Sequence, residues 1–256
     1  MGALLAIPLG LLIGAILGLV GAGGSIIAVP ALVYGVGLSP GEAIPSSLII
    51  VGLAALTAVL PRIRSNIDWN TAFPVGLAGI PATWLGATVN GLLNPNMLML
   101  AFAALMVAAA TRMLATNPTN RATDSDPGHR RRNMPKALLV GVIVGFLTGL
   151  LGIGGGFIIT PALILLLGLP TGTAVGTSLV IIVLNSISGF TSHLSGLELN
   201  WIVVLLFSAT AIIGSLIASR YATRLPDRII KMTFAIVVLT VAAFVAISST
   251  TALVTT

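Results

Sequence analysis

The sequence predicts an all-α polytopic membrane protein of two inverted repeats, each with about five helical segments and with short or broken helices at glycine-rich motifs. Three observations lead to this fold class. Of the 256 residues, 57% are hydrophobic and only 7% are charged, whereas soluble domains carry about 25% charged residues. The mean hydropathy is +1.12, and the apolar residues fall in runs long enough to cross a bilayer. The chain also repeats its own pattern of glycine, proline and hydroxyl residues, with Gly21 aligned to Gly152.

Ten apolar segments are predicted, five on each side of a polar linker. The first repeat, residues 1–115, has segments at about 3–20, 25–37, 43–61, 70–92 and 96–115. The linker, residues 116–136, is rich in Asp, Arg, Pro and Asn, which is typical of a solvated loop. The second repeat, residues 137–256, has segments at about 137–151, 157–168, 172–192, 199–219 and 229–247. The shortest segments cannot span a core about 30 Å thick, because a helix rises about 1.5 Å per residue.

The duplication rests on an ungapped match between the two repeats. The stretch GAGGSIIAVPAL at 21–32 aligns with GIGGGFIITPAL at 152–163. The same offset pairs two ladders with a glycine every fourth position, Gly10, Gly14 and Gly18 with Gly141, Gly145 and Gly149. These ladders predict faces for close helix packing. Gly79, Thr83 and Ala87, with Thr210, Gly214 and Ala218, form similar faces. The shared pattern indicates a true internal repeat.

The charges predict the topology. All twelve basic residues lie in three clusters, at 62–64, 112–136 and 220–231, while both termini and the 91–96 connection lack Lys and Arg. The positive-inside rule therefore places the clusters and the linker in the cytoplasm and both termini outside. Equivalent loops of the two repeats then lie on opposite sides of the membrane, as in many secondary transporters. The N-terminal stretch lacks a basic region before its apolar run, so we expect a first membrane helix and not a signal peptide.

The glycine-rich breaks are the strongest functional prediction. Each break has three small residues: Gly23, Gly24 and Ser25 in the first repeat, and Gly154, Gly155 and Gly156 in the second. Glycine tolerates positive φ, so each break can end one helix and start another. The free N–H groups of the new helix cannot face lipid. Two such starts, related by inverted symmetry, would direct partial positive charge at one midplane cavity and bind a small anion. The alternative is that these glycines only permit tight helix packing.

Hydroxyl groups open the third segment of each repeat. Ser46 and Ser47 in the first repeat align with Thr177 and Ser178 in the second. Two interpretations stay open: the hydroxyls bond to their own helix, or they donate to the same anion. Asn185, Ser186 and Ser188 give the second repeat a polar face that the first only partly matches, which predicts an asymmetric site.

Glu42 lies just before the predicted third segment. A carboxylate there suits the helix dipole, and capping is the favoured role. The functional alternative is ion coupling, because an acid within a membrane is a candidate for function by default.

Several activity classes are excluded by the composition. The chain has no cysteine, two histidines and six acids, which leaves no metal cluster and no nucleophile–base pair in the spans. We therefore predict neither an enzyme nor a metal or cofactor protein, and no nucleic acid as partner. The breaks are not nucleotide loops, because Ile26 and Phe157 stand where a dinucleotide fingerprint needs glycine.

The doubled Gly-x-Gly-Gly-[Ser/Gly]-φ-φ-x-x-Pro-Ala-Leu pattern resembles the TauE/SafE family of sulfite, sulfoacetate and related organosulfonate exporters and permeases. Each copy is followed by Gly-Leu and then by a Ser/Thr-Ser-Leu helix, and the resemblance covers essentially the whole chain. It implies a multi-pass permease of a prokaryotic plasma (inner) membrane that moves small, often sulfur-containing anions. It also implies that residues 21–25 with Pro30, and residues 152–156 with Pro161, are the signature segments.

Together these features predict a secondary transporter of a small anion such as sulfite, sulfoacetate or another organosulfonate. The partners expected are the anion, the lipid bilayer and a coupling ion, either a proton or sodium. No sequence feature indicates an oligomeric state. The alternative function is a passive anion channel, which would conduct current without exchange.

Overall fold

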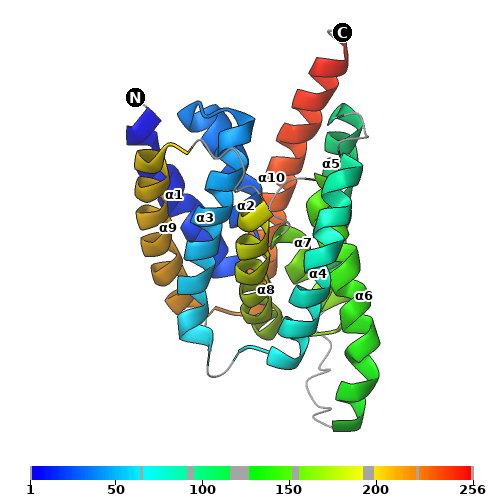
Figure 1. Cartoon of the computed structure of the whole chain (residues 1–256). Helices are drawn as coiled ribbons and strands as arrows, with labels where there is room; N and C mark the ends of the chain where they lie inside the picture. Colours follow the sequence, from blue (N-terminus) through cyan, green and yellow to red (C-terminus); the bar gives the residue numbers. More distant parts are fainter. Residues whose placement is uncertain are drawn as a thin grey trace.

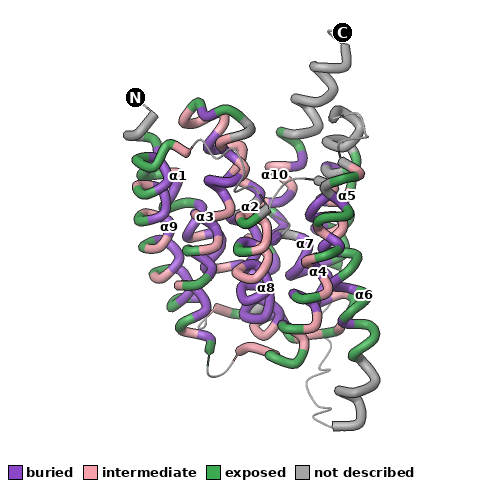
Figure 2. Tube along the Cα trace, viewed as in Figure 1, coloured by how far each residue is buried: buried purple, intermediate pink, exposed green. Residues whose placement is uncertain are grey.

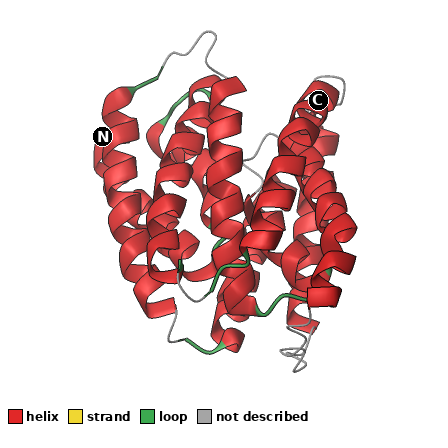
Figure 3. Cartoon of the chain, turned by 60° about the horizontal axis from the view of Figure 1, so that its bottom comes forward, coloured by secondary structure: helices red, strands yellow, loops and turns green. Residues whose placement is uncertain are grey.

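The computed structural model describes residues 2–63, 66–90, 95–115, 127–151, 156–192, 199–222 and 225–254, which form a bundle of helices (Figures 1 and 3). The first repeat contains α1 (Gly2–Val20), α2 (Gly24–Pro30), the π-helix η1 (Ala31–Val36), α3 (Pro40–Val59), the short 3-10 helix η2 (Leu60–Arg62), α4 (Trp69–Asn90) and α5 (Pro95–Ala115). The second contains α6 (Pro127–Leu151), α7 (Gly156–Leu165), α8 (Thr171–Ser192), α9 (Trp201–Ala222) and α10 (Asp227–Val254). Each predicted apolar segment corresponds to a helix, or to α2 together with η1, which confirms the all-α fold class.

Within the described residues, three stretches are long and apolar enough to cross a membrane. They are Glu42–Arg62, Thr171–Thr191 and Trp201–Ala222, which cover most of α3, α8 and α9. Shorter apolar helical stretches lie at Leu5–Val20, Ile26–Val36, Ala103–Ala115 and Met134–Leu150. These lengths and compositions are those of a polytopic membrane protein.

The polar linker is shorter than the sequence predicts. Helix α6 begins at Pro127, so the expectation of a loop is wrong for residues 127–136, while residues 116–126 lie outside the described part. Proline suits the first position of a helix, because its φ is already helical and its missing N–H would have no partner there. The following basic stretch then extends the helix beyond its apolar part.

The bundle has two distinct ends. Helix α1 begins and α10 ends at one end, at the top of Figure 1, which we call the terminal end. Helix α5 ends and α6 begins at the opposite end, the linker end. The basic residues that close η2, α5 and α9, namely Arg62, Arg112 and Arg220, lie at the linker end. Lys and Arg on one side of the bundle are what the positive-inside rule requires.

Equivalent helices of the two repeats run in opposite directions. Helix α3 packs on α8 with Leu48 beside Gly189 and Gly52 beside Ser186, so the two helices are antiparallel. Figure 1 shows the same reversal for α1 and α6, which run away from the terminal end and away from the linker end respectively. These directions are those expected from the predicted inverted repeats.

The two repeats pack against each other through close contacts between α1 and α9 and between α4 and α6. A Cβ atom on Gly14 of α1 would collide with the backbone of Ala211 on α9, and one on Gly145 of α6 would collide with the backbone of Gly79 on α4. The glycine ladders therefore lie against helices of the opposite repeat. Their predicted role in helix packing is confirmed, and small residues are what such close backbone contact needs.

The short second segment folds back along the first. The Cβ position of Gly24, at the start of α2, lies 2.8 Å from the carbonyl oxygen of Ile13, and that of Gly35, in η1, lies 2.7 Å from Leu9 Cδ1. Later residues thus meet earlier ones on α1, so α2 and η1 return toward the terminal end. Gly37 follows η1 with φ +85°. The aligned Gly168, which follows α7, has φ +69°.

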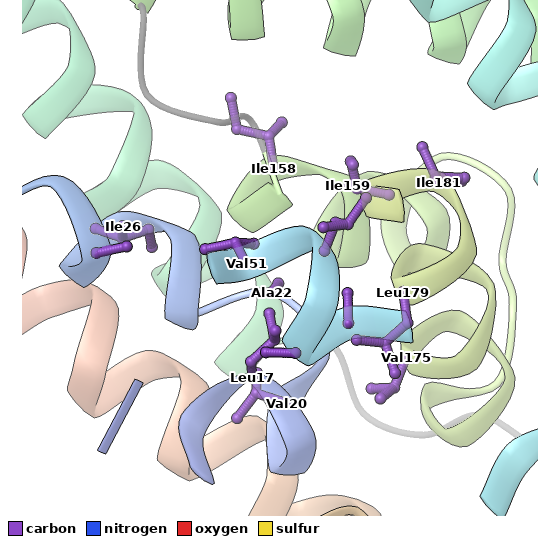
Figure 4. Close-up of a cluster of buried hydrophobic side chains, with 14 of the residues drawn as sticks. Leu17, Val20, Ala22, Ile26, Val51, Ile158, Ile159, Val175, Leu179 and Ile181 are labelled. Carbon is purple, nitrogen blue, oxygen red and sulfur yellow. The ribbon is translucent and has the colours of Figure 1, made fainter. Parts of the chain in front are cut away.

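Helices α2 and α7 meet in the core of the bundle. Figure 4 shows Leu17 of α1, Ala22 of the first break and Ile26 of α2 together with Ile158 and Ile159 of α7, and α2 contacts α7 directly. Helices α3 and α8 complete this cluster through Val51, Val175, Leu179 and Ile181. Figure 2 shows buried residues along these inner elements and exposed ones on the outward sides of α6 and α9. The interrupted segments therefore lie at the centre of the protein.

Candidate functional site

The first glycine-rich break turns at Gly21. Helix α1 ends at Val20, and Gly21 has φ +75° with its N–H donating to the Leu17 carbonyl oxygen at 2.8 Å. This left-handed residue just past a helix end is a common helix stop that favours glycine. Gly23 has φ −70°, so the expectation that positive φ explains Gly23 and Gly24 is wrong. The residue with positive φ is Gly21, two residues before Gly23.

Gly23 and Gly24 are in tight contact with α1. The Cβ position of Gly23 lies 2.6 Å from Ile16 Cγ2, and that of Gly24 lies 2.8 Å from both the carbonyl oxygen of Ile13 and Leu17 Cβ. These contacts support the packing alternative for both residues in this conformation. Gly156 is buried and begins α7. The Ser25 side chain and all of Gly154 and Gly155 lie outside the described part.

A buried hydroxyl network holds the first break against the second repeat. Ser178 Oγ lies 3.0 Å from the Gly21 carbonyl oxygen and 2.8 Å from that of Val175, and its single hydrogen is shared between them. Thr160 Oγ1 of α7 donates to Ser178 Oγ at 2.9 Å. Both hydroxyl residues are fully buried. The network therefore joins α1, α7 and α8 at a place where the sequence predicted only a donor on α8.

The other predicted hydroxyls also have protein partners. Ser46 donates to the Glu42 carbonyl oxygen at 2.6 Å, and Ser47 donates to that of Ile44 at 2.7 Å. Thr177 accepts a hydrogen bond from the Asp68 backbone N–H at 3.0 Å. These bonds support the interpretation that the hydroxyls stabilise their own helices and the loop before α4.

Glu42 takes part in a capping box. Its carboxylate accepts from the backbone N–H of Ser39 at 3.1 Å and from the Ser39 hydroxyl at 2.9 Å, while Ser39 Oγ accepts from the Glu42 N–H at 3.3 Å. This reciprocal pair is a standard N-terminal cap. The geometry accounts for the carboxylate through the capping role that the sequence favoured.

The first break lies toward the linker end. Gly21 bonds to Ser178, two turns before Ser186, where α8 crosses α3 at Gly52. The separation is roughly 12 Å along α8 at the helical rise. A Cβ on Gly176 would collide with the carbonyl oxygen of Asn66, in the connection that follows η2. Gly21 therefore lies closer to the linker end than the point where α3 and α8 cross.

Arg62 is a buried cation that sequence reasoning assigned to topology alone. Its side chain is 2% exposed, and its two terminal nitrogens donate to the carbonyl oxygens of Gly18 at 2.7 Å and Ala58 at 3.1 Å. The two acids with described side chains, Glu42 and Asp68, bond elsewhere. Arg62 comes directly after an apolar span and Pro61. This position next to the span is the one sequence feature that could have indicated a buried side chain.

Comparison with known proteins matches nearly the whole chain. The family model described as sulfite exporter TauE/SafE matches residues 6–245. A probable membrane transporter protein of Xylella fastidiosa (strain Temecula1) is 32% identical over 241 residues, 91% of each chain. The probable membrane transporter protein YunE of Bacillus subtilis is 29% identical over 254 residues, covering 91% of this chain and 93% of its own. A probable membrane transporter protein of Methanocaldococcus jannaschii is 29% identical over 203 residues, covering 75% and 74%.

Proposed function

This chain belongs to the sulfite exporter TauE/SafE family, and from that premise we propose that it is a secondary transporter of small, sulfur-containing anions. Sulfite, sulfoacetate and related organosulfonates are the substrate class. The membrane is the inner membrane of a prokaryote, with both termini outside and the linker in the cytoplasm. The basic residues at the linker end support this orientation.

One observation carries the proposal: the short helices that follow the two glycine-rich segments meet in the core of the bundle (Figure 4). Helices α2 and α7 occupy equivalent places in the two repeats and contact each other. Non-helical backbone at membrane depth is tolerated only where protein or a water-filled path surrounds it. Broken helices at the repeat interface are where secondary transporters bind their substrates.

We place the anion between α2 and α7, near the glycine-rich segments Gly23–Ser25 and Gly154–Gly156. Backbone N–H groups at a helix start favour an anion through hydrogen bonding and partial positive charge. Thr177 and Ser178 support the site from α8, because they bond to the loop before α4 and to the Gly21 carbonyl oxygen, while Ser46 and Ser47 bond within α3. The driving ion is a proton or sodium.

Proteoliposomes that contain the purified chain test this function. We expect saturable uptake of labelled sulfite, and acceleration of that uptake by unlabelled sulfite trapped inside, because a carrier exchanges its substrate. Current without such counterflow would favour the alternative, a passive anion channel. Vesicles that neither take up sulfite or sulfoacetate nor pass anion current would contradict both functions.

A further inference from the structure

The buried guanidinium of Arg62 lies close to the first glycine-rich break. It is 2% exposed and donates to the Gly18 carbonyl oxygen at 2.7 Å. Gly18 directly follows Leu17, and Leu17 Cβ lies 2.8 Å from the Cβ position of Gly24. Standard backbone dimensions therefore place the bonded guanidinium nitrogen within about 13 Å of that Cβ position. A full positive charge is thus held near the break without being part of it.

No acid with a described side chain offsets this charge. The Glu42 carboxylate bonds to Ser39, and the Asp68 carboxylate bonds to Thr71. The printed partners of the Arg62 guanidinium are carbonyl oxygens of α1 and α3. A buried charge is costly to desolvate and is usually paired with an opposite charge. A buried cation that has only neutral acceptors near a proposed anion site therefore calls for an electrostatic explanation.

The end of α1 gives that explanation. Helix α1 ends at Val20, directly before the break, and the C-terminal end of a helix is equivalent to about half a negative charge. This partial charge would repel an anion bound at the break. Gly18 lies in the last turn of α1, where carbonyl oxygens lack intrahelical donors. The bond from Arg62 to Gly18 sets a positive charge against this negative helix end.

We propose that Arg62 is a specificity-determining residue, whose charge makes the first break favour doubly charged anions over singly charged ones. The inference rests on the proposed transport function and names the charge class of its substrate. The guanidinium acts through space and needs no contact with the anion. At an effective dielectric constant of about 20, one unit charge about 12 Å away changes affinity about tenfold for each negative charge on the ligand.

Competition in proteoliposomes tests the inference with two sulfonates of different charge. Sulfoacetate carries two negative charges at neutral pH and methanesulfonate carries one, and each competes with labelled sulfite. The measured quantity is the ratio of the two inhibition constants. A loss of folded protein lowers the maximum rate of uptake and leaves this ratio unchanged, so the ratio separates an effect of charge from an effect on stability.

Two substitutions at Arg62 differ in charge. Arg62→Gln retains N–H donors without the charge, and Arg62→Lys retains the charge without the fork of the guanidinium. We expect Arg62→Gln to weaken methanesulfonate binding about tenfold and sulfoacetate binding about a hundredfold, so that the preference for sulfoacetate falls about tenfold. Arg62→Lys should keep the preference of the parent. A parent without this preference, or the same preference in both variants, overturns the inference while transport stands. A parent that takes up no sulfite overturns the proposed function itself.

A second pair of variants keeps the inference testable if Arg62→Gln does not fold. Asn66→Asp adds one negative charge in a side chain of the same shape, one turn after Arg62, whose carbonyl oxygen accepts from the Asn66 N–H at 3.0 Å. Asn200→Asp makes the same change before α9, where its side-chain oxygen keeps the bond to the Val203 N–H. We expect only Asn66→Asp to lower the preference for sulfoacetate, by about threefold, because salt screens exposed charges beyond about 10 Å. Equal preferences in these two variants would show that charge at the linker end does not act on the anion, and would overturn the inference.

Discussion

The hydroxyl oxygen of Ser178 lies 3.0 Å from the carbonyl oxygen of Gly21, 157 residues earlier in the chain. Gly21 directly follows α1, at a helix end whose last carbonyls lack intrahelical donors. A side chain of the second repeat thus stabilises the break of the first. Ser178 also bonds to Val175, and the aligned Ser47 makes the equivalent bond to Ile44. The two repeats therefore share the local hydroxyl bond, and only the second uses it beside a bond to the other repeat.

Ser178→Ala should destabilise the folded protein. The change leaves the buried Gly21 carbonyl and the Thr160 hydroxyl without their shared partner, at a cost of about 1–3 kcal/mol. The midpoint of thermal unfolding in detergent, followed by tryptophan fluorescence, measures the loss. Thr240→Ala is the control, because Thr240 is exposed and its hydroxyl donates to the Ile236 carbonyl oxygen of its own helix. Equal midpoints for the two variants would show that the link to Gly21 contributes nothing.

Gly14→Val should reduce the yield of folded protein. The new side chain would meet the backbone of Ala211, and an overpacked core loses about 1–3 kcal/mol or more when backbone cannot move. Size-exclusion chromatography after membrane extraction measures the folded fraction. Gly172→Val on α8 provides the comparison, because the nearest atom to a Cβ there, Asn66 Nδ2, is 3.9 Å away. Similar profiles for both variants would mean that the α1–α9 seam tolerates separation.

Periodicity and composition predict this fold well, because long apolar runs, glycine ladders and basic clusters are local features. The partners of those features are not local. The ladder at Gly14 packs on Ala211 of the other repeat, and no spacing in the sequence identifies α9 as that partner. The site is less predictable for the same reason. Gly24 seemed free to serve a ligand, yet its Cβ position faces the Ile13 carbonyl oxygen, so Gly24→Val is expected to disturb folding as well as transport.

Glu42→Gln should leave transport and its pH dependence unchanged. Glutamine at the third helical position also completes a capping box, so the bonds with Ser39 remain while the charge is lost. Sulfite uptake in proteoliposomes across a range of pH values measures the effect. Glu42→Ala, which removes the cap, should lower stability by about 0.5–2 kcal/mol. Loss of pH-driven uptake in Glu42→Gln at normal stability would instead identify Glu42 as the coupling acid.

Cysteine labelling should place the two ends of the bundle on opposite sides of the membrane. The parent has no cysteine, so Lys136→Cys in α6 and Asn200→Cys before α9 each introduce a single exposed thiol. We expect an impermeant reagent to label position 200 in intact cells and position 136 only after the cells are opened, because Lys and Arg face the cytoplasm. The reverse pattern would invert the topology.

Arg62→Met should destabilise the protein more than any exposed arginine substitution. The guanidinium bonds to Gly18 in the last turn of α1 and to Ala58 in the last turn of α3, where helix dipoles favour a cation. Methionine fills a similar volume but leaves both carbonyl oxygens without these donors, a loss of about 2–3 kcal/mol since hydrogen bonds to a charged group contribute about 1.5–3 kcal/mol. Arg62→Lys should recover part of this loss, because one ammonium group cannot reproduce the fork of the guanidinium. Thermal unfolding of both variants beside Arg228→Met, whose arginine is exposed, measures the order. Arg62→Met and Arg228→Met with the same midpoint would mean that the buried guanidinium does not join α1 to α3, and that its charge serves topology alone.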